Sequence, residues 1–489
     1  MSRRLLVVVA ALALASCAVG PDFKEPAAPA DAGYTPEKLA ATAATDVAGG
    51  TAQQFNIGED IPGEWWSLFH SPALDTLVKE ALAHNPDLTA AQASLRQAHE
   101  NTLATEGGFF PTIGAEFNHT REKLNGASIG QPKTRSIFSL NTGEITVGYS
   151  PDVFGGTRRQ VEASEAVETF QRFQLEAAYL TLTSNVVAAA VDEARLRAQI
   201  ASTEDIIKAD SDVLDLLNHQ FELGAVARGA VLQQAATLAQ VKSTLPPLEK
   251  LLAQERDRIA ALIGRFPNQP PGQTFDLATL TLPQALPVSL PSRLVEQRPD
   301  VRAAEATLHE ASAEVGVATA NMLPQFNLTG DIGTEAATLG GMFASGTGIW
   351  SLAAGVTQPL FHGGTLLHEK RAVEAAYDAA AAQYRSTVLS AFQNVADTLR
   401  ALQSDADALQ ASTAAERSAA DSLALAQDQY RLGAINYIEL LNAETTYRQT
   451  VIVFVQTQAA RYADTAALFE ALGGGWWHRS DVAQNQTQD

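Results

Sequence analysis

The chain has 489 residues, with 34 Lys and Arg against 55 Asp and Glu, so its formal net charge is −21. This length can bury a large core, and the acidic balance disfavours a nucleic acid as partner. The single Cys excludes a disulfide within the chain.

The first residues have the pattern of an export signal. Arg3 and Arg4 precede an apolar run that ends at Ala15 and is too short to span a bilayer. Residues 1–16 are therefore expected to be a signal peptide, whose removal lowers the formal charge from −21 to −23. Leu14 to Cys17 resembles the bacterial lipoprotein signal, which implies an acylated Cys17 as the first mature residue, and Ala18 in place of Asp implies outer membrane sorting. An ordinary signal with an incidental Cys is the alternative.

The segment from Ala18 to about Gln54 is rich in Ala, Pro, Gly and Thr, which predicts an extended tether rather than a packed domain. Trp65 and Trp66 form a first aromatic anchor. A helix then begins, with Ser71 as its N-cap and Pro72 in its first turn. After Asn85-Pro86, helical spacing resumes to about Thr105.

Strict alternation of apolar and polar residues follows that helix and predicts a β-hairpin at about 112–150. Ile113, Ala115 and Phe117 fall on one face of its first strand. A second hairpin with the same alternation is predicted at about 325–358. The four strands have the length that a tilted membrane strand needs, although ordinary soluble hairpins are the alternative.

Long Ala-rich helices are predicted at about 157–222, 226–264, 365–431 and 436–472. In the third, apolar residues recur with a mean spacing of about 3.6, which is the α-helical period. Pro246-Pro247 is expected to interrupt the second helix, because a proline inside a helix loses a hydrogen bond and clashes with the previous turn. The Pro-rich residues 267–291 are expected to connect two halves, and residues 476–489 to form a disordered tail.

Three landmarks recur in the same order, which indicates a duplicated half rather than a chance likeness of Ala-rich helices. Pro86-Asp87 returns 213 residues later as Pro299-Asp300, residues 151–156 return as 359–364, and residues 220–225 return as 429–434. The first repeat is expected over 71–290 and the second over 291–475. The landmark glycines are predicted turn residues: Gly155, Gly156, Gly224, Gly363, Gly364 and Gly433.

Four strands alone cannot form a stable membrane structure. An open sheet in lipid leaves edge N–H and C=O groups unpaired, so only a closed barrel is tolerated. Membrane barrels begin at eight strands. The sequence therefore predicts an oligomer, with the polar strand face lining a water-filled lumen.

The stretch from Pro291 to Ala306, PSRLVEQRPDVRAAEA, resembles the signature of the TolC-like outer membrane efflux proteins, in the lipoprotein subgroup of OprM and NodT. Residues 17–23, 245–249, 358–364 and 471–476 agree with this family, so the resemblance covers essentially the whole mature chain. It implies a mainly α-helical chain with membrane β-structure. Three chains would form a twelve-stranded β-barrel continued by an α-helical barrel, and residues 17–70 would supply the lipidated tether and an equatorial segment.

The resemblance also implies a function: the outer membrane exit channel of a tripartite efflux pump, extending into the periplasm. Such a channel passively conducts small molecules such as drugs. Its partners would be a periplasmic adaptor and an inner-membrane RND-type transporter. No nucleotide, metal or nucleophile motif is present, so no enzyme activity, cofactor or metal is expected. The alternatives are a periplasmic adaptor lipoprotein, a duct for type I protein secretion and an exported enzyme.

The family closes its periplasmic mouth with the turns that correspond to residues 223–225 and 432–434. Its members often carry Asp at the sixth or ninth residue after the turn glycine. This chain departs from that pattern, with Ala230 in the first half and Glu439 and Asn442 in the second. The expected aperture residues are Gln429, Tyr430, Glu439 and Asn442. Glu439 would form an acidic ring that favours cations, or it is a solvated helix residue and Tyr430 closes the neck by packing.

Overall fold

The computed structural model describes residues 18–30, 33–37, 39–125 and 135–479. The signal peptide, Cys17 and residues 480–489 lie outside this part of the chain. The chain divides into two compact units, and each takes segments from both repeats. We call them the strand unit, from residues 1–26, 94–171 and 304–384, and the helix unit, from residues 27–93, 172–303 and 385–489.

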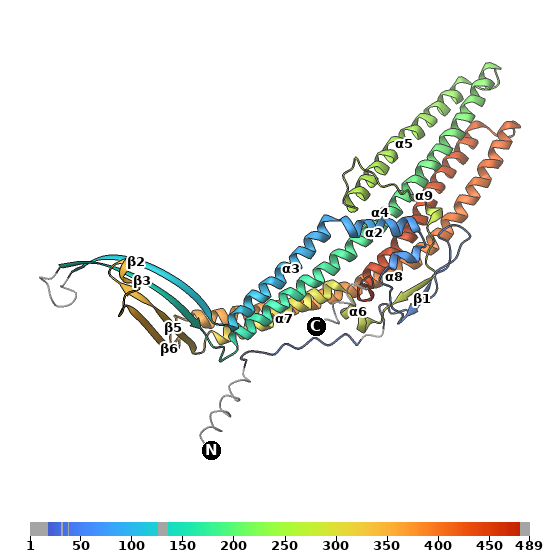
Figure 1. The fold of residues 1–489 in the computed structure, drawn as a ribbon. Helices are drawn as coiled ribbons and strands as arrows, with labels where there is room; N and C mark the ends of the chain where they lie inside the picture. Colours follow the sequence, from blue (N-terminus) through green and yellow to red (C-terminus); the bar gives the residue numbers. More distant parts are fainter. Residues whose placement is uncertain (1–17, 31–32, 38, 126–134, 480–489) are drawn as a thin grey trace. The chain divides into compact units, whose positions relative to one another are not determined.

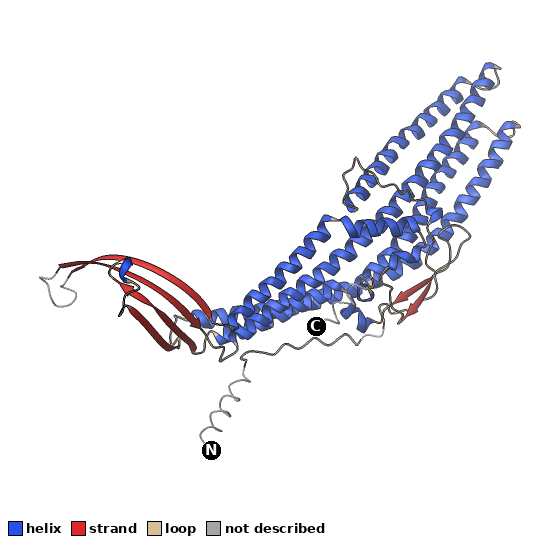
Figure 2. Ribbon diagram, viewed as in Figure 1, coloured by secondary structure: helices blue, strands red, loops and turns tan. Residues whose placement is uncertain are grey.

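The strand unit contains the two predicted hairpins, which are confirmed. Its antiparallel sheet has the order β2-β3-β5-β6 (Figures 1 and 2). The strands are β2 Thr112–Asn125, β3 Arg135–Tyr149, β5 Gln325–Ala336 and β6 Gly348–Thr357. The second strand of the first hairpin pairs with the first strand of the second hairpin, so the duplicated elements form one continuous sheet.

The register of this sheet gathers apolar side chains on one face. Ile113 lies opposite Val147, and Ile145 lies opposite Ile332, which in turn lies opposite Trp350. The other face carries the alternate, mostly polar positions: Glu116, Asn118, Glu144, Thr146, Thr329, Asp331 and Ser351. The predicted two-faced sheet is therefore present.

Four helices begin in one unit and end in the other: α3 Pro86–Glu106, α4 Gly156–Glu222, α7 Pro299–Ala320 and α8 Thr365–Arg431. The units therefore do not coincide with the two repeats. α4 and α8 each have 67 residues, or about 100 Å of helix at 1.5 Å per residue. Asp152 caps α4, accepting hydrogen bonds from the backbone N–H groups of Thr157 and Arg158 at 3.0 and 2.9 Å.

The helix unit also contains α2 Pro72–His84, α5 Arg228–Leu262, α6 Pro291–Gln297 and α9 Tyr437–Ala471. In this unit the end of α4 turns into α5, and the end of α8 turns into α9 (Figure 1). The bounds of the four long helices agree with the predicted ones to within two residues. The predicted cap of α2 is confirmed, because the Ser71 hydroxyl accepts from the Leu74 N–H at 3.4 Å. The aromatic anchor is also confirmed: Trp65 and Trp66 are each 1% exposed.

The prediction that Pro246-Pro247 interrupts the second long helix is wrong, because α5 continues through both residues. Both prolines lie on an exposed side of the helix. The carbonyls of Lys242 and Ser243, which lose their usual N–H partners, belong to residues that are also exposed. Water can therefore hydrate these carbonyls, while the buried side of α5 keeps its packing through Val241.

The prediction of a tether without packing is wrong for residues 42–53. Gln53 is 0% exposed, and its side chain accepts a hydrogen bond from the buried Arg461 at 2.8 Å. The chain then forms β1 Gln54–Ile57, which pairs in parallel with β4 Ala285–Val288 of the Pro-rich connector. Two segments that look irregular in sequence thus stabilise each other within the helix unit.

The predicted disordered tail is wrong for residues 476–479, and its remainder lies outside the described residues. The Trp476 indole N–H donates to the Gln297 carbonyl at 2.6 Å, and Arg479 pairs with Glu176 at 2.7 Å. These contacts pack the segment against the end of α6 and the body of α4 in the helix unit.

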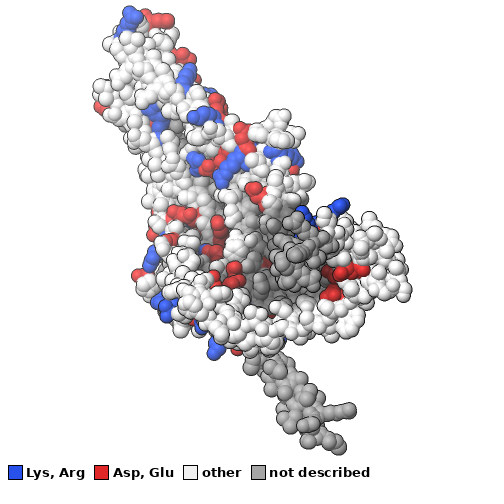
Figure 3. Space-filling model, turned by 90° about the vertical axis from the view of Figure 1, so that its left-hand side faces the viewer, with Lys and Arg blue, Asp and Glu red and all other residues white. Residues whose placement is uncertain are grey.

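Charged side chains of both signs are interspersed over the face in Figure 3. Within the described ranges, no helix is both long enough and apolar enough to cross a membrane.

Most of the predicted turn glycines have left-handed backbone conformations. The φ angles are 78° at Gly155, 75° at Gly224, 60° at Gly363, 88° at Gly364 and 70° at Gly433. An L side chain is strained at such angles, so these positions favour glycine. Gly156 differs, because it is the first residue of α4.

Candidate functional site

The ends of α4 and α8 have the same C-terminal geometry. At the end of α4, the Gly224 N–H donates to the Phe221 carbonyl at 2.9 Å and the Ala225 N–H to the Gln220 carbonyl at 2.8 Å. At the end of α8, Gly433 donates to Tyr430 at 3.0 Å and Ala434 to Gln429 at 2.8 Å. Both are Schellman motifs, in which a left-handed residue allows the chain to satisfy the last helix carbonyls. The two predicted turns are thus the same local structure, and Gln429 contributes its backbone carbonyl.

Two tyrosines connect the ends of α4 and α8 and the starts of α5 and α9. The Tyr430 hydroxyl of α8 donates to Gln220 Oε1 of α4 at 3.0 Å, and the Tyr437 hydroxyl of α9 donates to Gln234 Oε1 of α5 at 2.5 Å. The two rings lie edge to face with centroids 6.4 Å apart. Burial raises the pKa of both phenols, so both remain neutral hydrogen-bond donors at physiological pH.

A small core lies beneath the tyrosines. Leu217 of α4 is 0% exposed and Leu440 of α9 is 1% exposed, and both belong to one cluster with Tyr430, Tyr437 and Val213. Apolar contacts therefore hold α8 and α9 to the end of α4. The two tyrosine hydrogen bonds fix the orientation of the packed helices.

Glu439 has a local structural role at the start of α9. The Asn436 side chain accepts from the Glu439 N–H at 3.1 Å and donates to Glu439 Oε1 at 2.9 Å. Asn436 is thus a side-chain N-cap of α9, and Glu439 holds its amide in place by accepting from the side-chain nitrogen. Glu439 is exposed in the single chain, as is Asn442 one turn later.

A polar network lies deeper along the same helices. Arg448 of α9 pairs with Asp210 of α4 at 3.3 Å, and Asp210 is 2% exposed. Glu444 of α9 is 4% exposed, and burial, with a smaller effect from the charge of Asp210, raises its pKa to about 7. Burial also raises the pKa of Asp210, and the Arg448 guanidinium opposes that shift.

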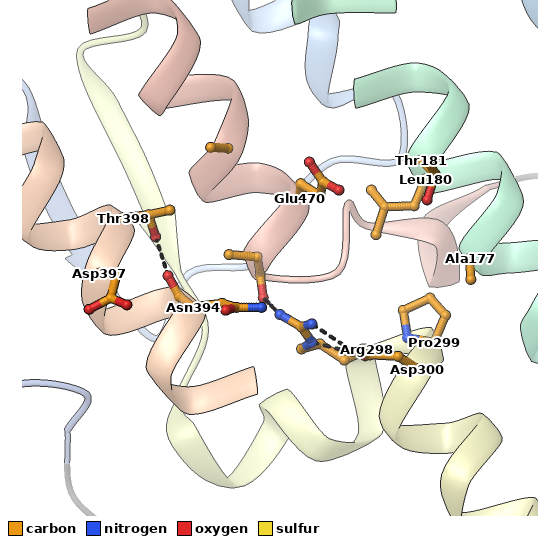
Figure 4. Close-up of a pocket in the computed structure, with 12 residues that line it drawn as sticks. Ala177, Leu180, Thr181, Arg298, Pro299, Asp300, Asn394, Asp397, Thr398 and Glu470 are labelled. Carbon is orange, nitrogen blue, oxygen red and sulfur yellow. Dashed lines mark hydrogen bonds and ion pairs between the residues drawn. The ribbon is translucent and has the colours of Figure 1, made fainter. Parts of the chain in front are cut away.

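The family signature at Arg298-Pro299-Asp300 borders an open cavity of about 380 Å³ in the helix unit (Figure 4). The Arg298 guanidinium donates to the Ala471 carbonyl at 2.8 Å, and it binds both carboxylate oxygens of Asp300 at 3.0 and 2.7 Å. Ala471 is the last residue of α9, whose end carbonyls have no partner within the helix. The signature therefore joins the start of α7 to the end of α9, which is a structural role.

The predicted aperture residues lie in two different settings. Tyr430 lies in the core of the helix ends, whereas Glu439 and Asn442 lie on exposed surface. The sequence reading missed Tyr437, Gln220 and Gln234. One signal was available for Gln220, because the duplication aligns it with Gln429, and a Gln directly precedes the aromatic residue in both repeats.

Comparison with known proteins places the chain among exporters. The sequence profile of the family described as outer membrane efflux protein matches residues 77–265 and 290–474. The cation efflux system protein CusC of Escherichia coli O6:H1 is 28% identical over 477 residues, which cover 97% of this chain and 99% of that protein. The toluene efflux pump outer membrane protein TtgC of Pseudomonas putida is 26% identical, with 99% and 98% covered. The solved outer-membrane channel OprN has a TM-score of 0.83 at 26% identity, with 94% and 100% covered.

Proposed function

The chain belongs to the outer membrane efflux protein family and is an outer membrane exit channel for efflux, and we propose that it conducts small molecules passively through a duct built by three copies. The predicted family, fold class and outer membrane location are confirmed by the matches. The fold is that of a trimeric channel, in which a β-barrel is continued by an α-helical barrel.

The four-stranded sheet is the observation that carries the proposal. Its apolar face is open in the single chain, with Ile113 73% exposed, Trp350 76% and Leu352 80%. Its outer strands β2 and β6 each have a neighbour on one side only. An apolar face this large fits lipid, and unpaired strand edges in lipid require partners. Three sheets joined edge to edge satisfy both requirements.

The substrate is proposed to be small. The names of two relatives refer to cations and to toluene, which are ions and small molecules rather than secreted proteins. The proposed partners are a periplasmic adaptor and an inner-membrane RND-type transporter, which supplies the energy. The chain itself is proposed to perform no chemical step. Its selectivity then rests on the width and charge of its aperture.

The oligomer can be tested in isolated outer membranes. Amine-reactive crosslinking of the full-length protein is expected to give a covalent trimer. Without crosslinking, the trimer is expected to survive mild detergent and to dissociate in SDS. Native mass measurement in detergent provides the independent size. The trimeric duct is refuted if outer membrane fractions contain monomers alone.

The lipid anchor is a separate part of the proposal. We expect Cys17→Ser to abolish acylation and to leave the fold intact, because the fold rests on the sheet and the long helices. Mass spectrometry of the mature N-terminus checks the modification, and native size checks the trimer. A wild-type N-terminus without lipid would contradict the anchor but not the channel.

A further inference from the structure

A cavity of about 240 Å³ lies in the helix unit between α4, α8 and α9. Asp205 and Asp210 border it from α4, and Glu444 and Arg448 border it from α9. Three carboxylates and one guanidinium therefore line it. Its lining includes neither of the turns at Gly224 and Gly433 and none of the proposed aperture residues.

The buried, unpaired carboxylate of Glu444 distinguishes this cavity from an ordinary cluster of acidic residues. It is 4% exposed, and within the described chain neither of its carboxylate oxygens has a hydrogen-bond partner. The nearby Arg448 is committed elsewhere, with one nitrogen on Asp210 at 3.3 Å and another on the Thr445 hydroxyl at 3.0 Å. A buried carboxylate without a partner is costly, and a bound cation would remove that cost.

The rest of the lining is apolar and aromatic. Ile206, Leu423 and Val451 contribute aliphatic surface, and Tyr447 contributes a ring that can face a cation. The volume corresponds to about eight waters at roughly 30 Å³ each, which is smaller than a site for a drug-sized molecule. A bare ion would leave the aliphatic surface without contacts. In the described residues, no group of three or more His, Cys, Asp or Glu side chains is arranged to hold a metal ion.

We propose that this cavity binds small organic ammonium ions, with the ammonium group on the Glu444 carboxylate and the hydrocarbon part against Ile206, Leu423 and Val451. A trimer would contain three such sites. The assignment goes beyond the proposed function, because it requires binding in the helix unit and not conduction.

The test uses the full-length trimer in detergent and 4-fluorobenzylammonium as the probe. Fluorine NMR should show broadening of the probe signal that saturates and that unlabelled benzylammonium reverses. Neutral 4-fluorobenzyl alcohol has the same ring and should not bind. Equal binding of the alcohol, after subtraction of empty micelles, would overturn the proposal, and this comparison needs no variant.

A charge-only substitution locates the site. Glu444→Gln should weaken binding of the ammonium probe at least about tenfold, because it removes the charge and keeps the shape. Glu249→Gln is the matched control, since Glu249 is an exposed carboxylate on α5 outside the cavity, and it should bind as the wild type does. Undiminished binding by Glu444→Gln in a trimer of native size would overturn the assignment.

The pH dependence gives a second readout. Burial raises the pKa of Glu444 to about 7, and binding requires its ionised form, so affinity should fall as the pH falls. Binding at pH 6 should be about tenfold weaker than at pH 8. The other charged or titratable groups at the cavity are Asp205, Asp210, Tyr447 and Arg448. Displacement of the probe by Mg²⁺ at constant ionic strength would assign the cavity to inorganic cations instead and would refute the proposal.

Discussion

The two helix turns share one backbone structure but differ in the side chains that hold them. Both end in a Schellman motif with a left-handed glycine, Gly224 in the first repeat and Gly433 in the second. In the first, Phe221 is 43% exposed, and Ala227 at the N-cap of the following helix α5 gives no side-chain cap. In the second, the equivalent aromatic residue is Tyr430, which is 8% exposed.

The second turn is also the better capped, because Asn436 and Glu439 bond reciprocally at the start of α9. Duplication has thus preserved the turn, whose geometry depends on one glycine, while the contacts around it have diverged. The difference indicates that the second turn is the more firmly held of the two.

Tyr430→Ala should have the largest effect on the second turn. The change removes the ring from the core of the helix ends and its hydrogen bond to Gln220. We expect open conductance in planar bilayers to rise several-fold, because the end of α8 is no longer held to α4 by this ring and its hydrogen bond. Phe221→Ala is the matched change in the first turn and should alter conductance much less. Equal effects of the two changes would show that the turns are not held differently.

Tyr437→Phe should destabilise the helix ends by about 1 to 3 kcal/mol, because Gln234 is 0% exposed and its Oε1 would lose the hydroxyl donor. Tyr430→Phe should cost less, about 0.5 to 1 kcal/mol, because Gln220 is partly exposed and water can replace the hydroxyl. Hydrogen exchange of the amides in α8 and α9 measures both as free energies of local opening. A larger loss of free energy for Tyr430→Phe than for Tyr437→Phe would mean that burial does not set the strength of these hydrogen bonds.

One substitution in either turn should reduce the difference in capping between α5 and α9. Asn436→Ala should lower the local stability of α9 by about 1 kcal/mol. Ala227→Asn should raise that of α5 by about 0.5 to 1 kcal/mol, because Ala227 already has the extended backbone of an N-cap, with φ −76° and ψ 148°. Amide exchange in the first turn of each helix is the measurement. No gain from Ala227→Asn would mean that something besides the missing cap limits the first turn.

Glu439→Gln should have the smallest structural effect, because the Gln side-chain oxygen can accept the same hydrogen bond from Asn436 Nδ2. It is therefore a test of charge alone. If three copies of Glu439 form an acidic ring, the variant should lower cation selectivity in planar-bilayer recordings at neutral pH. Its trimer and its conductance should stay near those of the wild type. Unchanged selectivity would leave Glu439 with the capping role only.

Features that depend on neighbouring residues could be predicted from the sequence. Alternation over a few residues predicted all four strands of the membrane sheet, and the 3.6-residue period predicted the long helices to within two residues. The glycine landmarks predicted the turns, because left-handed backbone is a property of one residue. The duplication and the signature predicted the family, and the family implied the trimer.

Tertiary structure decided everything that depends on residues far apart in the chain. Tyr430 and Gln220 are 210 positions apart, and the sequence does not show that they meet. The proline pair stays within α5 because those residues happen to face water, and Gln53 is buried because Arg461 packs over it. The unpaired carboxylate of Glu444 looks like any helix residue until three helices enclose it. The local pattern sets which element forms, whereas burial and hydrogen-bond partners are set by what packs against it.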